Sequence, residues 1–174
     1  FFAGRAAVFF RWMGQIPLRR GDDESTDWAL EMASYALDHG AKVGIYPEGT
    51  RSPNGTLYRG KTGVARMAME AKVPIIPVAM INTYEIQPPG QVRPSLRRVG
   101  IRLGRPLDFG RYEGLENDRF VLRSVTDEVM YELMTLSGQE YVDMYAAKAK
   151  TLSADAALEV EQPDPDELRR SEER

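Results

Sequence analysis

The sequence predicts an α/β fold, a mixed and largely parallel sheet flanked by helices in a single domain. Two observations lead to this class. Residues 43–81 place an apolar run, a turn-rich loop, a helical stretch and a second apolar run in that order, which is the pattern of a βαβ unit with a right-handed crossover. Helical periodicity recurs on both sides of this unit, and 174 residues suffice for one sizeable core.

Composition excludes several function classes. The formal net charge of −3 argues against bulk nucleic-acid binding. The absence of Cys excludes disulfides, thiolate metal sites and a Cys nucleophile, and it fits a reducing compartment. His39 is the only histidine, so we expect no multi-histidine metal site. No apolar run reaches the roughly 18 residues of a membrane-spanning helix, and there is no signal-peptide pattern.

Residues 1–13 are predicted to form a helix, because apolar side chains recur there at helical spacing. They are Phe2, Ala6, Phe9 and Met13. Gly14 suits the position just after the helix. Two interpretations remain open: the helix packs on the sheet of its own domain, or its aromatic face lies among lipid headgroups. Residues 16–18 are predicted to be a short edge strand, since they include a proline.

A second helix is predicted over residues 26–38 from the same periodicity. His39 and Gly40 follow it directly. A histidine is favourable at the negative end of a helix, and glycine suits the residue after its C-cap. We therefore interpret His39 as a capping residue and not as a catalytic base.

The central loop, residues 46–52, reads YPEGTRS and follows a short apolar run at residues 43–45 that is predicted to end a buried strand. Pro47 would end that strand, because it has no N–H to donate. Glu48 would place a carboxylate at the carboxyl edge of the sheet, where ligands of open α/β folds bind. Arg51 offers a planar set of donors suited to phosphate. On these residues alone, a ligand site and a solvated loop are equally consistent.

The segment after this loop adds a second basic group. Residues 53–55 read PNG, a strong turn signal. Residues 59–63 read RGKTG and precede a helix predicted over residues 64–71. Two glycines around Lys61 can present backbone N–H groups and a positive charge to an anion, although the spacing does not match a P-loop.

Two more strands are predicted. Residues 75–81 are continuously apolar, which is typical of a strand buried on both faces, and the prolines at 74 and 77 place its start at an edge. Residues 82–94 form a long loop. Residues 99–104 alternate apolar with other side chains, which predicts a half-buried strand.

The last third of the chain predicts two helices. The first opens at Asp118 and ends at Gly138, with apolar residues along one face. The second covers residues 139–150. We assign residues 1–150 to the domain and residues 151–174 to a charged, disordered tail, because its later prolines and charges lack apolar periodicity.

Taken in this order, the motifs resemble the 1-acylglycerol-3-phosphate acyltransferase family over roughly residues 10–106. Residues 14–20 (GQIPLRR) are similar to the second sequence block of the family. Residues 46–52 are similar to its third block, with Tyr46 where Phe is usual. Residues 73–78 (VPIIPV) are similar to its fourth block. Three blocks in order make the resemblance specific, and it implies a glycerol-3-phosphate acyltransferase-like fold.

The catalytic block of the family, an Asn-His with an Asp five residues after the His, is absent. His39 lies between the second and third blocks, and Gly44 stands where the Asp would be needed. Because the chain begins with Phe1, we expect that this block lies upstream, that the N-terminal part of the domain is missing, and that the fragment is inactive. The alternative is a natural relative that has lost the block.

The resemblance implies transfer of a fatty acyl group from acyl-CoA or acyl carrier protein to 1-acyl-sn-glycerol 3-phosphate (lysophosphatidic acid), giving phosphatidic acid for phospholipid biosynthesis. It implies no cofactor besides the acyl donor, no metal, no nucleic-acid partner, and association with the cytoplasmic face of a membrane. Two alternatives remain: a related acyltransferase acting on glycerol 3-phosphate or another lysolipid, and a non-catalytic relative that binds lipid or phosphate.

The resemblance also implies the residues of the site. Arg51 would hold the phosphate together with Arg20 and Lys61. Glu48 would support catalysis by positioning the glycerol or a neighbouring arginine. The implied substrate-binding residues are Arg20, Gly49, Thr50, Arg51 and Lys61. The implied supports of an acyl-chain groove are Pro74, Ile75 and Pro77.

Overall fold

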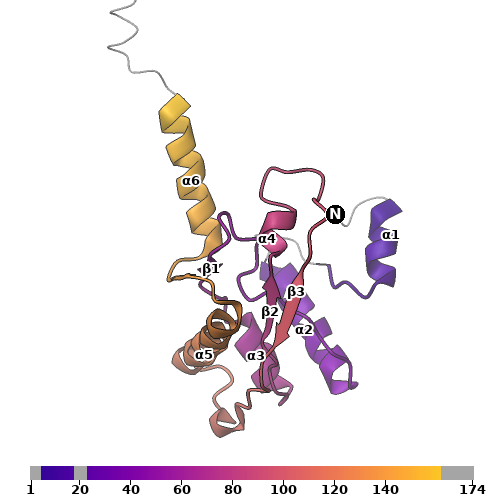
Figure 1. Cartoon of the computed structure of the whole chain (residues 1–174). Coiled ribbons are helices and arrows are strands. Elements are labelled where there is room, and N and C mark those ends of the chain that lie inside the picture. Colours follow the sequence, from indigo (N-terminus) through magenta and orange to yellow (C-terminus); the bar gives the residue numbers. More distant parts are fainter. Residues whose placement is uncertain (1–4, 18–22, 162–174) are drawn as a thin grey trace, which may run out of the picture.

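The computed structural model describes residues 5–17 and 23–161 of the chain (Figure 1). Helices surround two short sheets, and the predicted mixed α/β class is confirmed. The helices are α1 (Arg5–Trp12), α2 (Asp23–Asp38), α3 (Gly63–Glu70), α4 (Thr83–Ile86), α5 (Arg119–Ser137), α6 (Ala146–Glu161) and the short 3-10 helix η1 (Gly110–Tyr112).

One sheet is parallel and the other antiparallel. In the parallel sheet, β1 (Leu57–Tyr58) pairs with β4 (Tyr141–Val142). In the antiparallel sheet, β2 (Val78–Ile81) pairs with β3 (Gly100–Leu103). The helix α5 packs on the β2–β3 pair and on α3, and α3 packs on α2, so the helices form successive layers on one side of that pair. The central loop, residues 46–52, precedes β1 in the sequence.

The strand pairing predicted within residues 43–81 is wrong. Residues 43–45 form no strand, and the side chain of Ile45 is exposed. The other half of the predicted pair does form β2, preceded by a single bridge between Ile75 and Leu107, but its partner is antiparallel. Antiparallel pairing with a segment close in sequence needs no crossover and closes a shorter loop. The edge strand predicted near Pro17 is also absent at residues 16 and 17, and residue 18 lies outside the described residues.

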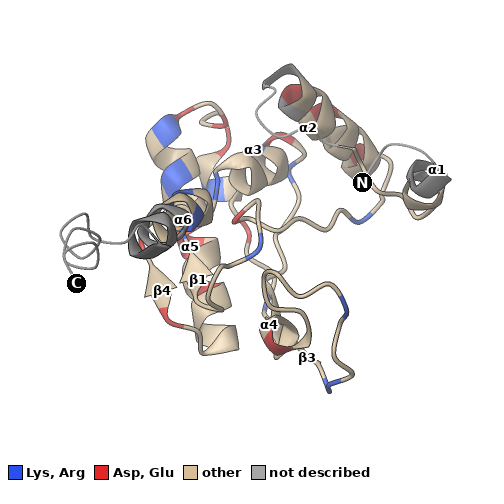
Figure 2. Cartoon of the chain, turned by 90° about the horizontal axis from the view of Figure 1, so that it is seen from above, with Lys and Arg blue, Asp and Glu red and all other residues tan. Residues whose placement is uncertain are grey.

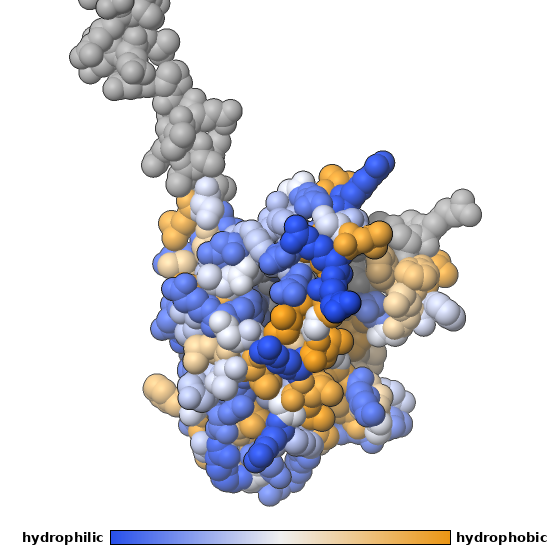
Figure 3. All heavy atoms as spheres, in the orientation of Figure 1, coloured by the Kyte–Doolittle hydropathy of each residue, from blue (hydrophilic) through white to orange (hydrophobic). Residues whose placement is uncertain are grey.

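The strand burial predicted from the sequence is also wrong. In β2, Ala79 is buried but Val78 is exposed, so only one face is covered. In β3, Ile101 is 62% and Leu103 is 70% exposed. Because α5 covers a single face of this two-stranded sheet, the opposite face stays open. Figure 3 shows the result as an apolar area over the β2–β3 face.

The helix boundaries follow their capping residues. The Asp118 carboxylate accepts hydrogen bonds from the N–H groups of Phe120 and Val121 at the start of α5. Gly138 ends α5 with φ +73°. At the end of α2, the ring of His39 places Nδ1 2.8 Å from the Tyr35 carbonyl oxygen, which confirms its role as a capping residue.

The helix predicted over residues 139–150 begins later and continues further than expected. Residues 141 and 142 form β4, because their backbone pairs with β1, and the helix α6 starts at Ala146. It runs to Glu161, through the first part of the predicted tail. Residues 162–174 lie outside the described residues. Figure 1 shows α6 projecting from the body of the molecule, and Figures 1 and 2 both place α6 on the side opposite to α1.

The main core lies between α3 and α5. Its buried residues are Ala65, Met69, Phe109, Leu122, Val125 and Val129. A second, smaller cluster joins Tyr58 of β1 to Ala146 and Ala149 of α6. This second cluster matters for the site, because it attaches the first turns of α6 to the strand that follows the central loop.

Candidate functional site

The central loop turns back on itself at Gly49. The Gly49 N–H donates to the Tyr46 carbonyl oxygen at 3.0 Å, and Gly49 has φ +69°. A residue with a side chain would pay about 1–2 kcal/mol for this left-handed conformation. A Cβ at this position would also lie 3.3 Å from Cε of Lys61. Glycine therefore serves both the turn and the close approach of the Lys61 side chain.

Glu48 ties the loop to β1. Its Oε2 accepts a hydrogen bond from the Tyr58 N–H at 2.9 Å. Burial raises the pKa of Glu48 above its ordinary value of 4.5, while the Tyr58 N–H and the charge of Lys150 pull the pKa back down. The carboxylate is thus half-buried with a backbone donor and a cation beside it. Glu48 therefore anchors the central loop to β1.

Two lysines complete the contacts of the loop. The Lys61 N–H donates to the Pro47 carbonyl oxygen at 2.8 Å, which holds the two segments together. Lys150 reaches across from α6, and its Nζ donates to Thr50 Oγ1 at 2.7 Å. The structure therefore brings together four of the predicted site residues, with Lys150 added. The four are Glu48, Gly49, Thr50 and Lys61. In Figure 2, acidic and basic positions lie next to each other on the loops between α6 and α3.

Arg51 differs from its neighbours. Its side chain is exposed and makes no hydrogen bond or ion pair with any other described residue. Arg20 lies outside the described residues, so its predicted partnership with Arg51 stays a prediction. Two cavities, of about 440 and 350 Å³, lie elsewhere: the first between α2 and α3, the second between α5 and β4. The loop presents Arg51 on an open surface.

The predicted supports of an acyl groove are part of the packing between strands and α5. The Ile75 N–H donates to the Leu107 carbonyl oxygen at 3.0 Å, and its side chain packs on the main core. Pro77 is buried and its carbonyl oxygen accepts from the Gly104 N–H, whereas Pro74 is exposed. Neither of the two cavities is lined by these residues, and their role toward an acyl chain stays a prediction.

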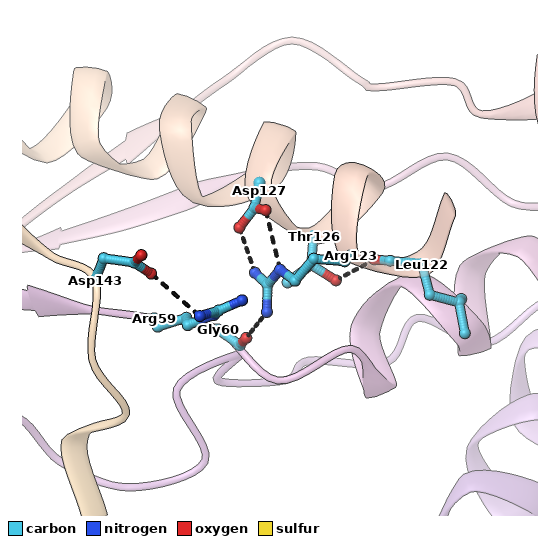
Figure 4. Close-up of polar contacts among 7 residues, drawn as sticks. All are labelled: Arg59, Gly60, Leu122, Arg123, Thr126, Asp127 and Asp143. Atoms are coloured by element: carbon cyan, nitrogen blue, oxygen red, sulfur yellow. Dashed lines mark hydrogen bonds and ion pairs between the residues drawn. The ribbon is translucent and has the colours of Figure 1, made fainter. Parts of the chain in front are cut away.

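The segment that carries Lys61 is clamped by α5 (Figure 4). Arg123 Nη1 donates to the Gly60 carbonyl oxygen at 2.7 Å, and the same guanidinium pairs with Asp127 one turn along the helix. A Cβ at Gly60 would lie 2.8 Å from Sδ of Met130 and 3.1 Å from Cγ2 of Thr126. Only glycine lets the backbone come this close to α5. The clamp fixes the backbone just before Lys61.

The turn after the loop forms as the PNG motif predicts. The Gly55 N–H donates to Ser52 Oγ at 2.9 Å, and Gly55 has φ +87°. The Tyr58 hydroxyl and the Thr56 hydroxyl both donate to Oδ1 of Asn54. The Ser52 hydroxyl is therefore engaged in the turn. Among residues 5–17 and 23–161, no cluster of three or more His, Asp or Glu side chains could hold a metal ion.

Sequence reasoning missed Lys150 and Arg123. Both lie on helices whose positions relative to the loop depend on contacts distant in sequence. One signal was available for Lys150. It lies four residues after Ala146 and one residue after Ala149, so it falls on the side of α6 that carries small residues. No comparable signal singles out Arg123 among the arginines of the chain.

Comparisons with known proteins find similar sequences and a similar structure. The model of the family described as Acyltransferase matches residues 2–81. The matched region includes the whole central loop and Lys61.

The names of the similar proteins indicate which kind of acyltransferase the chain resembles. The chloroplastic 1-acyl-sn-glycerol-3-phosphate acyltransferase BAT2 of Brassica napus is 37% identical over 78 residues, 45% of this chain and 23% of that protein. The 1-acyl-sn-glycerol-3-phosphate acyltransferase alpha of Ovis aries is 29% identical over 136 residues, 78% of this chain and 46% of that protein. The crystal structure of the 1-acyl-sn-glycerophosphate (LPA) acyltransferase PlsC from Thermotoga maritima matches with a TM-score of 0.56 at 25% identity, covering 75% of this chain and 49% of that one. The chain thus spans about half or less of each of these proteins.

Glu48→Gln tests the buried carboxylate. Because burial raises the pKa of Glu48, the folded state binds the proton more tightly than the unfolded state. The stability contributed by this group is therefore fully present below pH 4.5 and is lost as the pH rises through the raised pKa. As the pH rises above about 4.5, we expect the unfolding free energy of the wild type to fall relative to that of Glu48→Gln. Urea unfolding between roughly pH 4 and pH 8 measures this difference. The exposed Glu140→Gln is the control, and parallel pH profiles for wild type and Glu48→Gln would contradict the assignment.

Gly60→Ala tests the clamp. The added methyl group would collide with Met130 and Thr126, so we expect a loss of about 1–3 kcal/mol in unfolding free energy. Gly44→Ala is the matched control, because a Cβ there meets nothing within 4 Å, and it should stay within about 0.5 kcal/mol of wild type. Equal stabilities of the two variants in denaturant unfolding would show that α5 does not constrain this segment.

Proposed function

We propose that this chain is the phosphate-binding part of an acyltransferase that moves a fatty acyl group from acyl-CoA or acyl carrier protein to 1-acyl-sn-glycerol 3-phosphate, giving phosphatidic acid. The names of the similar proteins support this acceptor. The observation that carries the proposal is a cation packed against the central loop: the Lys61 side chain lies beside Gly49, two residues before Arg51 in the sequence, and a half-buried carboxylate holds this turn.

The reaction is a direct transfer. A base removes the proton of the free hydroxyl of the acceptor, the hydroxyl oxygen attacks the thioester carbonyl, and the thiol of the donor leaves with a proton. No covalent enzyme intermediate is needed, consistent with a chain that contains no Cys. His39 caps α2 through its contact with the Tyr35 carbonyl, so we do not assign it as the base. This chain supplies the side of the site that holds the acceptor.

The donors on the loop suit a phosphate monoester. The Arg51 guanidinium can pair with two phosphate oxygens at once, and none of its donors is engaged by another described residue. Lys61 adds a point charge beside Gly49. Glu48 keeps the loop in place on β1. Holding the acceptor in this way would lower the barrier by positioning its hydroxyl toward the thioester.

We further propose that the enzyme works at the cytoplasmic face of a membrane, where a lysolipid acceptor resides. Trp12 of α1 is 82% exposed, and Val8, Phe9 and Met13 are exposed beside it. Figures 1 and 2 place α1 at the periphery of the molecule. An aromatic and apolar surface of this kind suits the headgroup zone. None of the helices within the described ranges has both the length and the apolarity required to cross a bilayer.

Arg51→Ala tests the phosphate contact. We expect the dissociation constant of glycerol 3-phosphate for the chain to rise about tenfold, because a bidentate charge-assisted contact is lost. Glycerol, which lacks the phosphate, should show no difference. Isothermal titration measures both, with Arg98→Ala, an exposed arginine in the loop before β3, as the control. Equal losses in the two variants would indicate general electrostatics and would contradict the assignment of Arg51.

An acceptor panel separates the alternatives. In an enzyme preparation that contains this chain, Arg51→Ala should raise KM for lysophosphatidic acid while KM for the acyl donor stays within about twofold. Faster turnover with glycerol 3-phosphate or another lysolipid would reassign the acceptor. Binding without acyl transfer to any acceptor would identify a non-catalytic relative.

Replacing Phe9 and Trp12 by Glu tests the membrane contact. Removing two aromatic side chains from the apolar surface of α1 should lower the fraction of chain that co-sediments with anionic phospholipid vesicles by about tenfold. The control is Leu96→Glu, which removes a fully exposed apolar side chain from the loop before β3. If the Leu96 variant loses as much binding as the α1 variant, α1 is not the contact surface.

A further inference from the structure

The first turns of α6 are fixed next to the strand that anchors the central loop. Ala146 is fully buried, Ala149 is 8% exposed, and both pack against Tyr58, which is 5% exposed. The backbone supports the same junction, since the Arg59 N–H donates to the Met144 carbonyl oxygen at 3.0 Å. Tyr58 is also the residue whose N–H binds Glu48. The start of α6 and the central loop therefore share one attachment point.

Lys150 lies on the face of α6 that this attachment directs toward the loop. It follows Ala146 by four residues and Ala149 by one, so the three residues share one side of the helix. Its ammonium donates to Thr50 Oγ1 at 2.7 Å, in a partly buried contact between residues 100 positions apart. Lys148, two residues earlier, is exposed on another side. The contact thus follows from helix geometry and from the packing of the two alanines.

We propose that Lys150 is a positioning residue for the phosphate-binding loop: it holds Thr50 and balances the Glu48 carboxylate, so that Lys61 and Arg51 stay available to a phosphate monoester. The ligand in this inference rests on the proposed function. The family model ends at residue 81 and so does not assign this lysine.

The electrostatics of the loop explain why such a residue is needed. A half-buried carboxylate loses part of its hydration and draws nearby cations toward it. The charge of Lys150 acts on Glu48 and lowers its pKa against the effect of burial. Without Lys150, the next cation beside the turn is Lys61, whose side chain already crosses Gly49. If Lys61 formed an ion pair with Glu48, one positive charge fewer would be available to bind the phosphate of the ligand.

Lys150→Met tests the inference on the 174-residue chain, with glycerol 3-phosphate and inorganic phosphate as probes. We expect the dissociation constant of glycerol 3-phosphate to rise about five- to tenfold, because Lys61 is drawn to Glu48 and no longer pairs with the phosphate. In a Lys61→Met background, where Lys61 cannot replace it, Lys150→Met should raise the pKa of Glu48 further, followed by NMR of the Glu48 side-chain carboxyl carbon. Lys148→Met is the matched control and should change neither quantity. Lys150→Arg keeps the charge and should restore most of the binding.

The outcomes separate the inference from the proposed function. If Arg51→Ala weakens binding but Lys150→Met behaves like Lys148→Met, the role of Lys150 is refuted and the phosphate site stands. If binding weakens while the pKa of Glu48 stays unchanged by Lys150→Met in the Lys61→Met background, Lys150 does not act through the carboxylate and the inference fails. If neither Arg51→Ala nor Lys150→Met affects either probe, the phosphate site itself is refuted, and the inference with it. Unaltered far-UV circular dichroism of Lys150→Met guards against a folding defect.

Discussion

The hydrogen bond between the Tyr58 N–H and the Glu48 carboxylate is the contact on which the arrangement of the site depends. It joins the central loop to β1 at a half-buried position, where a lost partner would leave a charged group without compensation. β1 in turn pairs with β4, and β4 lies between α5 and α6 in the chain. By way of β1 and β4, this bond connects the central loop to the part of the chain that forms α5 and α6, much later in the sequence.

The two helices hold the loop from different sides and by different means. α5 acts through close packing of Met130 against Gly60 and through a hydrogen bond that Arg123 donates to the Gly60 carbonyl oxygen. α6 acts through charge, because Lys150 faces both Thr50 and Glu48. Rigid supports of this kind position the donors of a site better than the loop alone could. The open β2–β3 face takes no part in this support, since its exposed side chains lie away from α5.

The sequence predicted best what local chemistry determines. Asp118, Gly138 and the pair at residues 39–40 mark helix ends through contacts with residues two to four positions away, so the helices they bound were found. The strands were harder, because pairing joins distant segments. β1 and β4 have two residues each and carry no periodicity, and the apolar run at residues 43–45 found no partner. The central loop motif predicted Glu48 and the segment at residues 59–63 predicted Lys61, but the contribution of Lys150 depends on where α6 is placed, which no local pattern encodes.

The long reach of α6 has a consequence for how the molecule is made. At about 5–20 residues per second on the ribosome, the 100 residues between Thr50 and Lys150 take about 5–20 s to emerge. During that interval the loop has left the ribosome without its C-terminal supports. A nascent chain stalled before α6 would hold α2 and α3 complete and still lack the contact between Lys150 and Thr50, so translation itself sets the earliest moment at which the loop can take the arrangement described here.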